Sequence, residues 1–133
     1  MRVVIDTNIL MAGLLNLNGG AAKIIEHFRK GDFELIISRE VFEEYLQVIH
    51  YFENEIPYIR SEELLGLIFE RAVKVIPANS EGLCKDPDDE KFLATAISGN
   101  AQYIVTKNKK DFPHNLTTVK IVNVREFLKE IER

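Results

Sequence analysis

The chain has 133 residues, of which 46% are hydrophobic and 29% charged, a composition typical of globular proteins. We expect a single domain spanning residues 1–133. The net charge of −4 argues against a basic surface over the whole molecule, and the single cysteine, Cys84, excludes an internal disulfide or a cysteine-rich zinc site. No apolar run approaches the ~20 residues that span a bilayer, and the N-terminus lacks a signal-peptide core. These features predict a cytoplasmic protein with no membrane partner.

Short apolar runs alternate with amphipathic segments along the chain. A buried strand is expected at 2–6, followed by a helix at 19–31, a strand at 33–38, helices at 39–52 and 61–73, and a strand at 73–77. Ser61 is the expected N-cap of the helix at 61–73. A loop at 78–86 leads to a helix at 87–100, then strands at 102–106 and 119–123 and a last helix at 124–132. This order predicts an α/β fold, a three-layer α/β/α sandwich with a parallel sheet of about five strands.

Polar residues stand at the ends of two of the expected strands. Asp6 closes the first strand, and Thr106 closes the fourth with Asn108 just beyond it. Open parallel sheets bind ligands beyond the carboxyl ends of their strands, where the strand order reverses, so these residues are site candidates. Asp6 has an alternative role as the N-cap of the next turn.

The helix at 39–52 carries two adjacent glutamates that a helical wheel separates. Glu43 falls on the solvated face, whereas Glu44 lies at the border of the apolar stripe. Glu44 is therefore the inward candidate, and its alternative role is that of a surface glutamate lying along the helix.

The stretch "KDPDDEKF" crowds four carboxylates at a helix start. Asp86 precedes Pro87 and is the natural N-cap, while Asp88 and Glu90 are interpreted as solvated charges that suit the helix dipole. Asp89 falls within the apolar stripe and should point toward the core. Because burial penalises a lone carboxylate, Asp89 needs a cation or hydrogen-bond donors.

Asp6, Glu44 and Asp89, with Asp86 assisting, come from three separate segments and converge at one edge of the expected sheet. Ionised carboxylates at one point repel each other unless a cation neutralises them. Ligation by oxygen alone favours Mg²⁺ or Mn²⁺ over zinc. Such a site activates water and steadies the charge on a phosphodiester, so the residues predict a metal-dependent phosphoryl hydrolase.

Over nearly its whole length the chain resembles the PIN-domain ribonucleases, and especially the VapC-like toxins of prokaryotic toxin–antitoxin pairs. The resemblance rests on "VVIDTNIL", "IISREVFEEYLQVI" and "KDPDDEKFLATAISGNAQYIVTKNKKDF". It implies a PIN-like fold in which Asp6, Glu44 and Asp89 are acidic metal ligands, with Thr7 and Asn8 supporting the end of the first strand. It also implies a Mg²⁺-dependent endoribonuclease acting on RNA, whose partners are a cognate antitoxin and a second copy of the chain in a homodimer.

One position departs from the family pattern. Many members carry an aspartate where this chain has Asn108, and an amide can coordinate only through an uncharged carbonyl. Asp111, three residues on, is expected to replace it in part. In the same segment, Lys107, Lys109 and Lys110 are expected to contact the RNA backbone through its phosphates, unless "KNKK" is only a solvated loop and Asn108 only a turn residue.

Three other functions compete with this interpretation. A receiver-type signalling domain would need an acidic pair at the first strand end and a phospho-accepting Asp after the third. A phosphatase that forms an aspartyl-phosphate usually needs an acid where Asn8 stands. A PIN-like module without activity, binding only RNA or protein, is the third alternative, and Asn108 favours it.

Overall fold

The computed structural model describes residues 1–78, 82–116 and 118–133, so residues 79–81 of the loop expected at 78–86 lie outside it. Five strands and six α-helices occur in these residues, in the order β1 (Arg2–Ile5), α1 (Thr7–Leu15), α2 (Gly20–Lys30), β2 (Glu34–Ile37), α3 (Arg39–Tyr51), α4 (Tyr58–Arg71), β3 (Val73–Lys74), α5 (Glu90–Ser98), β4 (Tyr103–Val105), β5 (Lys120–Val122) and α6 (Val124–Ile131). Two short 3₁₀ turns, Pro87–Asp89 and Lys109–Asp111, precede α5 and follow β4.

The strands form one parallel sheet in the order β3-β2-β1-β4-β5. This confirms the expected five-stranded parallel sheet. The chain builds outward from β1 to one side, then returns to add β4 and β5 on the other. The order therefore reverses between β1 and β4, and the side chains that follow these two strands meet at that point.

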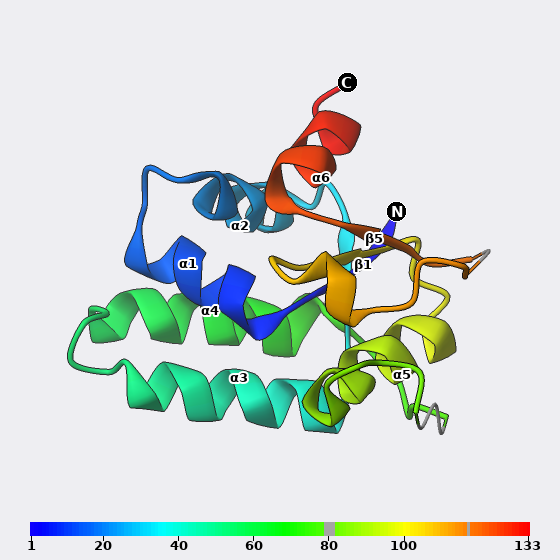
Figure 1. Ribbon diagram of the computed structural model, residues 1–133. Coiled ribbons are helices and arrows are strands. Elements are labelled where there is room, and N and C mark those ends of the chain that lie inside the picture. The colour runs from blue at the N-terminus through cyan, green and yellow to red at the C-terminus, as the bar shows by residue number, and fades with distance from the viewer. Residues whose placement is uncertain (79–81, 117) are drawn as a thin grey trace.

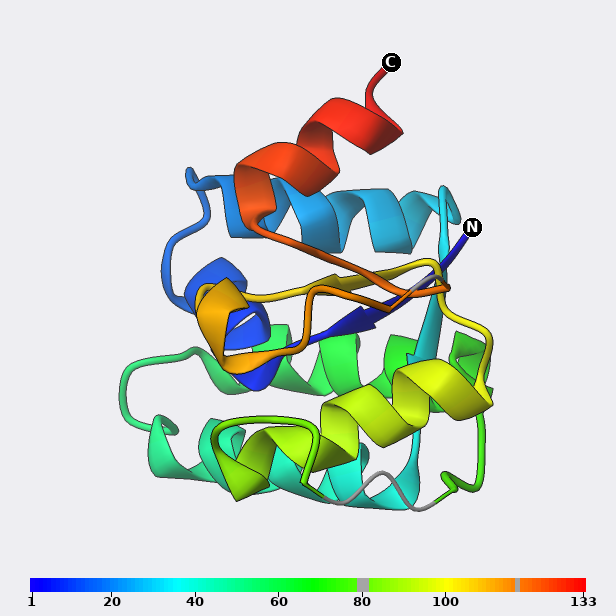
Figure 2. The ribbon, with the colours of Figure 1, turned by 45° about the vertical axis from the view of Figure 1, so that its right-hand side comes forward.

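Helices cover both faces of the sheet and confirm the three layers. Figures 1 and 2 show α2 and α6 on one face and α3, α4 and α5 on the other, with α1 beyond the end of β1. The strand residues between these layers are almost wholly buried, including Val3, Val4, Leu35, Ile36 and Ile104. This explains why the strands read as continuous apolar runs.

Three details differ from the sequence predictions. Helix α1 was not predicted, and it is apolar nearly all round and largely buried, so it shows no amphipathic period. The prediction of Ser61 as an N-cap is wrong, because α4 begins at Tyr58 after Pro57 and Ser61 lies buried within it. The third strand ends at Lys74 instead of residue 77. It lies at the edge of the sheet, where strands are commonly short.

The stretch after Asp86 forms a 3₁₀ turn before it becomes an α-helix. The Asp86 carboxylate accepts a hydrogen bond of 2.9 Å from the Asp88 backbone N–H, which makes Asp86 the cap of this turn as expected. The α-helix itself begins at Glu90, so Asp89 occupies the junction between the two helical forms.

Within the part of the chain that the structure describes, none of the helices has the length and apolar character needed to cross a membrane.

Candidate functional site

Asp6 and Thr106 lie side by side where β1 and β4 end. Asp6 follows β1 and its backbone N–H donates to the Val105 carbonyl over 3.0 Å, which fixes its place against β4. The Thr106 hydroxyl donates to Asp6 Oδ2 over 2.7 Å, and the Asn108 N–H donates to Thr106 Oγ1 over 3.1 Å. Asp6 is only 6% exposed. The predicted contribution of Thr106 is thus a direct contact that orients the Asp6 carboxylate.

The pKa of Asp6 is raised, chiefly because burial removes water from its charged form. The Thr106 hydroxyl acts in the opposite direction, and the negative charge of Glu44 raises the pKa further. Hydrogen bonds from the backbone of Asn8 and Thr7 lower it slightly. Hydrogen-bond donors therefore stabilise the charged form of the buried Asp6 carboxylate, while the charge of Glu44 opposes it.

Glu44 reaches this point from α3, whose N-terminus is capped by the Ser38 hydroxyl. Glu44 is half-buried, while Glu43 is exposed and pairs with Arg39, as the helical wheel predicts. The Thr7 hydroxyl donates to Glu44 Oε2. Thr7 begins α1 directly after Asp6, so this hydrogen bond ties the end of β1 to α3.

Asp89 is half-buried, and its pKa is raised to about 6. Burial is the largest cause, followed by the charges of Asp6, Asp86, Asp111 and Glu44. Four other carboxylates, of which only Asp86 belongs to the same stretch as Asp89, are thus close enough for their charges to act on Asp89. The charges of these acids therefore reach Asp89 in the folded chain, and their convergence on one ligand stays a prediction.

The two assisting acids lie farther from the core. Asp86 is exposed and caps its own 3₁₀ turn. Asp111 is half-buried at the end of the second 3₁₀ turn, and its carbonyl accepts from the Lys85 N–H over 3.0 Å. This hydrogen bond holds the segment before Asp86 against the segment after β4.

The lysines of "KNKK" are not equivalent. Lys107 and Lys110 are exposed, as is Asn108 between them. Lys109 instead pairs with Glu126 at the start of α6, with Nζ 2.8 Å from Oε1. Lys107 and Lys110 are therefore accessible to a ligand, and Lys109 has an acidic partner within the chain.

Lys91 is a site residue that the sequence analysis did not single out. Its Nζ lies 2.6 Å from Glu44 Oε1, across the interface between α5 and α3. The sequence signal was its place in "KDPDDEKF", two residues after Asp89. In the same stretch the prediction that Glu90 is a solvated charge is wrong, because Glu90 is half-buried and accepts a hydrogen bond from the Cys84 backbone N–H.

The donors at this edge of the sheet suit a hard divalent cation in kind, since all are oxygens and their charges oppose one another. As the side chains stand, however, no three His, Cys, Asp or Glu groups within 1–78, 82–116 and 118–133 are gathered so that they could hold one ion. Thr7 and Lys91 hold the two Glu44 oxygens.

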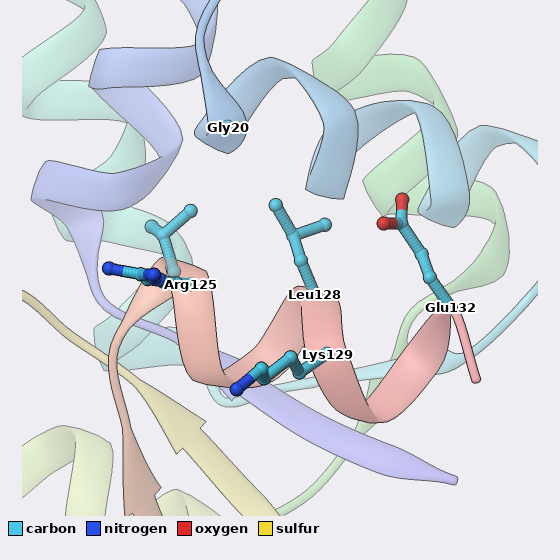
Figure 3. A pocket seen from close by; sticks show the side chains of 6 residues that line it. Gly20, Arg125, Leu128, Lys129 and Glu132 are labelled. Atoms are coloured by element: carbon cyan, nitrogen blue, oxygen red, sulfur yellow. The ribbon is translucent and has the colours of Figure 1, made fainter.

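A hollow lies away from these acids. Figure 3 shows it between the start of α2 and α6, with Leu128 and Glu132 pointing from α6 toward α2. Its volume is about 550 Å³, and Gly20, Arg125 and Lys129 also line it. None of the acids described above contributes to it. The candidate site at the reversal of the sheet is therefore separate from this hollow.

Comparison with known proteins assigns the chain to a family. Residues 2–110 match the family model described as "PIN domain". The uncharacterized protein MJ1680 of Methanocaldococcus jannaschii is 26% identical over 148 residues, an alignment that covers 100% of this chain and 93% of that protein. A chain in the crystal structure of VapBC2 from Rickettsia felis, bound to a DNA fragment from their promoter, superposes with a TM-score of 0.57 at 18% identity. That match covers 92% of this chain and 98% of the other. By the match over residues 2–110, this chain belongs to the PIN domain family.

Proposed function

We propose that this chain is a metal-dependent endoribonuclease and the toxin component of a toxin–antitoxin pair. PIN domains are generally nucleases, which supports hydrolysis of a phosphodiester. The observation that carries the proposal is the proximity of Asp6, Glu44 and Asp89 around the reversal of the sheet, where burial first, and then the charges of the neighbouring acids, raise the pKa of Asp89 to about 6.

Asp6, Glu44 and Asp89 are the residues that would hold Mg²⁺ or Mn²⁺, with Asp86, Asp111 and Asn108 at the periphery. When bound, such an ion supplies Lewis acidity that lowers the pKa of water and steadies charge on a phosphodiester. Asn108 adds no negative charge. Fewer carboxylates of this chain would therefore balance the charge of the cation than if an aspartate stood at this position.

The protein's own groups have separate tasks in this proposal. Thr106 fixes one Asp6 oxygen, and Thr7 fixes one Glu44 oxygen, so both carboxylates keep their direction while RNA binds. Asp89 is half-buried where its charge is opposed by the neighbouring acids, which suits it to bind a cation together with Asp6 and Glu44. Lys107 and Lys110 are exposed in the segment that follows β4 and are available to contact RNA phosphates.

Protein partners are supported by exposed apolar residues on α3 and α4. Tyr51, Tyr58, Ile59 and Phe69 are 66–81% exposed, and a hollow of about 370 Å³ between the two helices is lined partly by Leu46, Ile49, Ile56 and Leu65. Such surfaces commonly mark protein interfaces. We assign this surface to a cognate antitoxin or a second copy of the chain. The structural similarity to VapBC2 from Rickettsia felis supports the first of these.

The rival functions differ in their support. A receiver-type domain has the strand order 2-1-3-4-5, whereas this sheet has β3-β2-β1-β4-β5, so the topology contradicts that alternative. A PIN-like module without activity has one observation in its favour, namely Asn108. Measurements of metal binding and of RNA cleavage distinguish this inactive module from a nuclease.

The test is cleavage of end-labelled single-stranded RNA with Mg²⁺ or Mn²⁺. We expect cleavage that stops with chelator and that is abolished in Asp6→Asn and Asp89→Asn, because each substitution removes a charge from the ligand set. Asp88→Asn and Glu43→Gln are matched controls, since each changes an exposed acid directly beside a site acid.

Full cleavage activity in both Asp6→Asn and Asp89→Asn would contradict the assignment of these acids to the site. Circular dichroism must show that the variants are folded. Expression in a bacterial host tests the toxin role: the unchanged chain should arrest growth, and Asp6→Asn should not. Growth arrest by both would show that toxicity does not come from this site.

A further inference from the structure

Lys91 is held against Glu44 through its ammonium group. It lies in the first turn of α5, its side chain is 28% exposed, and Nζ contacts Glu44 Oε1 over 2.6 Å. The Glu44 side chain is 23% exposed. The two charges therefore meet in a half-buried place where water screens them less than at the surface.

The backbone of Lys91 is fixed as well. The Thr95 hydroxyl lies 2.6 Å from the Lys91 carbonyl and 2.8 Å from the Ser38 hydroxyl, and both Thr95 and Ser38 are buried. Ser38 caps α3, the helix that carries Glu44. This chain of contacts couples α5 to α3, so the pairing of Lys91 with Glu44 follows from the packing of the two helices.

Both carboxylate oxygens of Glu44 are thereby engaged, one by Lys91 and one by Thr7. We propose that Lys91 is a positioning residue that acts as a built-in counter-charge to Glu44 and competes with divalent cations for it. This inference rests on the proposed function, because it concerns the same acids. It makes Lys91 the residue that sets how much divalent cation the site requires.

The physical reason is charge. An ammonium group near the acids neutralises part of their repulsion, and it also repels an incoming cation over a few ångströms. Divalent cation binding through Glu44 must therefore displace Lys91 or share a carboxylate with it. Removing the ammonium removes this competition while leaving the oxygen donors unchanged.

The test measures Mn²⁺ affinity without RNA, by calorimetry or by the electron paramagnetic resonance signal of free Mn²⁺. We expect Lys91→Met to bind Mn²⁺ about tenfold more tightly than the unchanged chain. Lys91→Arg keeps the charge and should bind as the unchanged chain does. Lys23→Met is the matched control, because it removes an exposed lysine on α2 and should not change the affinity.

A second pair of measurements separates competition from a structural role. Lys91→Met should lower the Mg²⁺ concentration for half-maximal RNA cleavage, a shift that general loosening of the fold would not produce. In a Glu44→Gln background the same substitution should have little effect on Mn²⁺ affinity. If Lys91→Met does not fold, Lys91→Gln serves in its place.

Unchanged or weaker Mn²⁺ binding in Lys91→Met, or no Mn²⁺ binding in any variant, would overturn the inference. Failure of the proposed function is a different result: no cleavage of RNA by the unchanged chain, or cleavage that does not depend on Asp6, whatever the order of the Mn²⁺ affinities.

Discussion

Asp89 carries a charge that its surroundings oppose. Because its pKa is raised to about 6, the folded protein holds the proton more tightly than an unfolded chain does. Ionised Asp89 therefore lowers the free energy of unfolding. This free energy increases as the pH falls from about 6 toward 3.8, the ordinary pKa of aspartate, and decreases again as the pH rises. A carboxylate that opposes folding at neutral pH is typical of a functional site.

We predict that Asp89→Asn stabilises the protein while abolishing cleavage. In chelator at pH 8 the Tm should rise by a few degrees, because the amide has no charge to be repelled. The gain should shrink below pH 6 and vanish near pH 4, where aspartate is protonated in the folded state. Thermal unfolding followed by circular dichroism across this range measures it.

Asp88→Asn is the control for this prediction. Asp88 is exposed one residue away, so its substitution should not reproduce a gain that grows with pH. A fall in the Tm of Asp89→Asn at pH 8 would contradict the account of Asp89, because it would mean that the carboxylate stabilises the fold.

The acids were predictable one by one, and their cationic partner was not. Asp6 follows an apolar strand, Glu44 borders an apolar stripe and Asp89 falls within one, so the local pattern identifies these three acids as candidates. Lys91 looks like an ordinary solvated helix residue, and its partner Glu44 is 47 positions away. Likewise, only the packing of α6 reveals that Lys109 pairs with Glu126. Pairings between distant segments are set by packing, which the local pattern does not contain.

At the scale of elements, His27 joins the ends of α2 and α6. Its Nδ1 lies 2.7 Å from Asp32 Oδ2, and its Nε2 lies 2.9 Å from Glu132 Oε2. Figure 3 shows Glu132 extending from α6 toward α2. The hydrogen bond to Glu132 is the largest cause that raises the pKa of His27 above its ordinary 6.5, and that to Asp32 is next.

We predict that this contact makes α6 more firmly docked in acid than in base. With a raised pKa in the folded state, the stabilisation is fully present below about 6.5 and is lost as the pH rises through the higher, folded value. His27→Gln should therefore lower the Tm at pH 6 and have a much smaller effect at pH 9. Hydrogen exchange of the α6 amides should show faster opening at pH 6 in the variant.

His50→Gln is the comparison for His27. His50 also faces an acid, Glu53 at 3.2 Å, but its side chain is 79% exposed and both residues belong to one stretch of chain. Exposed pairs contribute little, so this substitution should change the Tm less. Equal effects of the two substitutions, or an effect of His27→Gln that does not vary with pH, would refute the bridge between α2 and α6.

The order of the elements was predictable because strands that are buried on both faces of the sheet appear in the sequence as continuous apolar runs. Helix α1 escaped prediction for a related reason: "TNILMAGLL" is buried nearly all round, so it lacks the polar face that identifies an amphipathic helix. The start of α4 was misplaced because Ser61 and its following glutamates look like a helix start, although Pro57 caps the helix and Ser61 packs inside. Tertiary burial overrides the local signal at both places.

At the scale of the whole molecule, the site joins parts of the chain that are distant in sequence. Asp6 follows β1, Glu44 belongs to α3 and Asp89 lies at the start of α5, and α5 packs on both β1 and α3 beside the reversal of the sheet. A ligand that binds the three together binds only the folded state, since an unfolded chain does not bring them together. Binding should therefore stabilise the entire fold and not one loop.

We accordingly predict that Mn²⁺ raises the Tm of the whole molecule in a single transition, and that chelator reverses the rise. At a free concentration of about 100 times the Kd, the added stability is about 2.7 kcal/mol. For a chain of this size that corresponds to a shift on the order of 10 °C. Asp6→Asn should show almost none of the shift, while Glu43→Gln should show all of it. The shift should grow with the logarithm of Mn²⁺ concentration, and calorimetry should give the same transition temperature as circular dichroism. An equal shift in Asp6→Asn would mean that the ion acts elsewhere on the protein, because Asp6 is the most buried acid at the point where the strand order reverses.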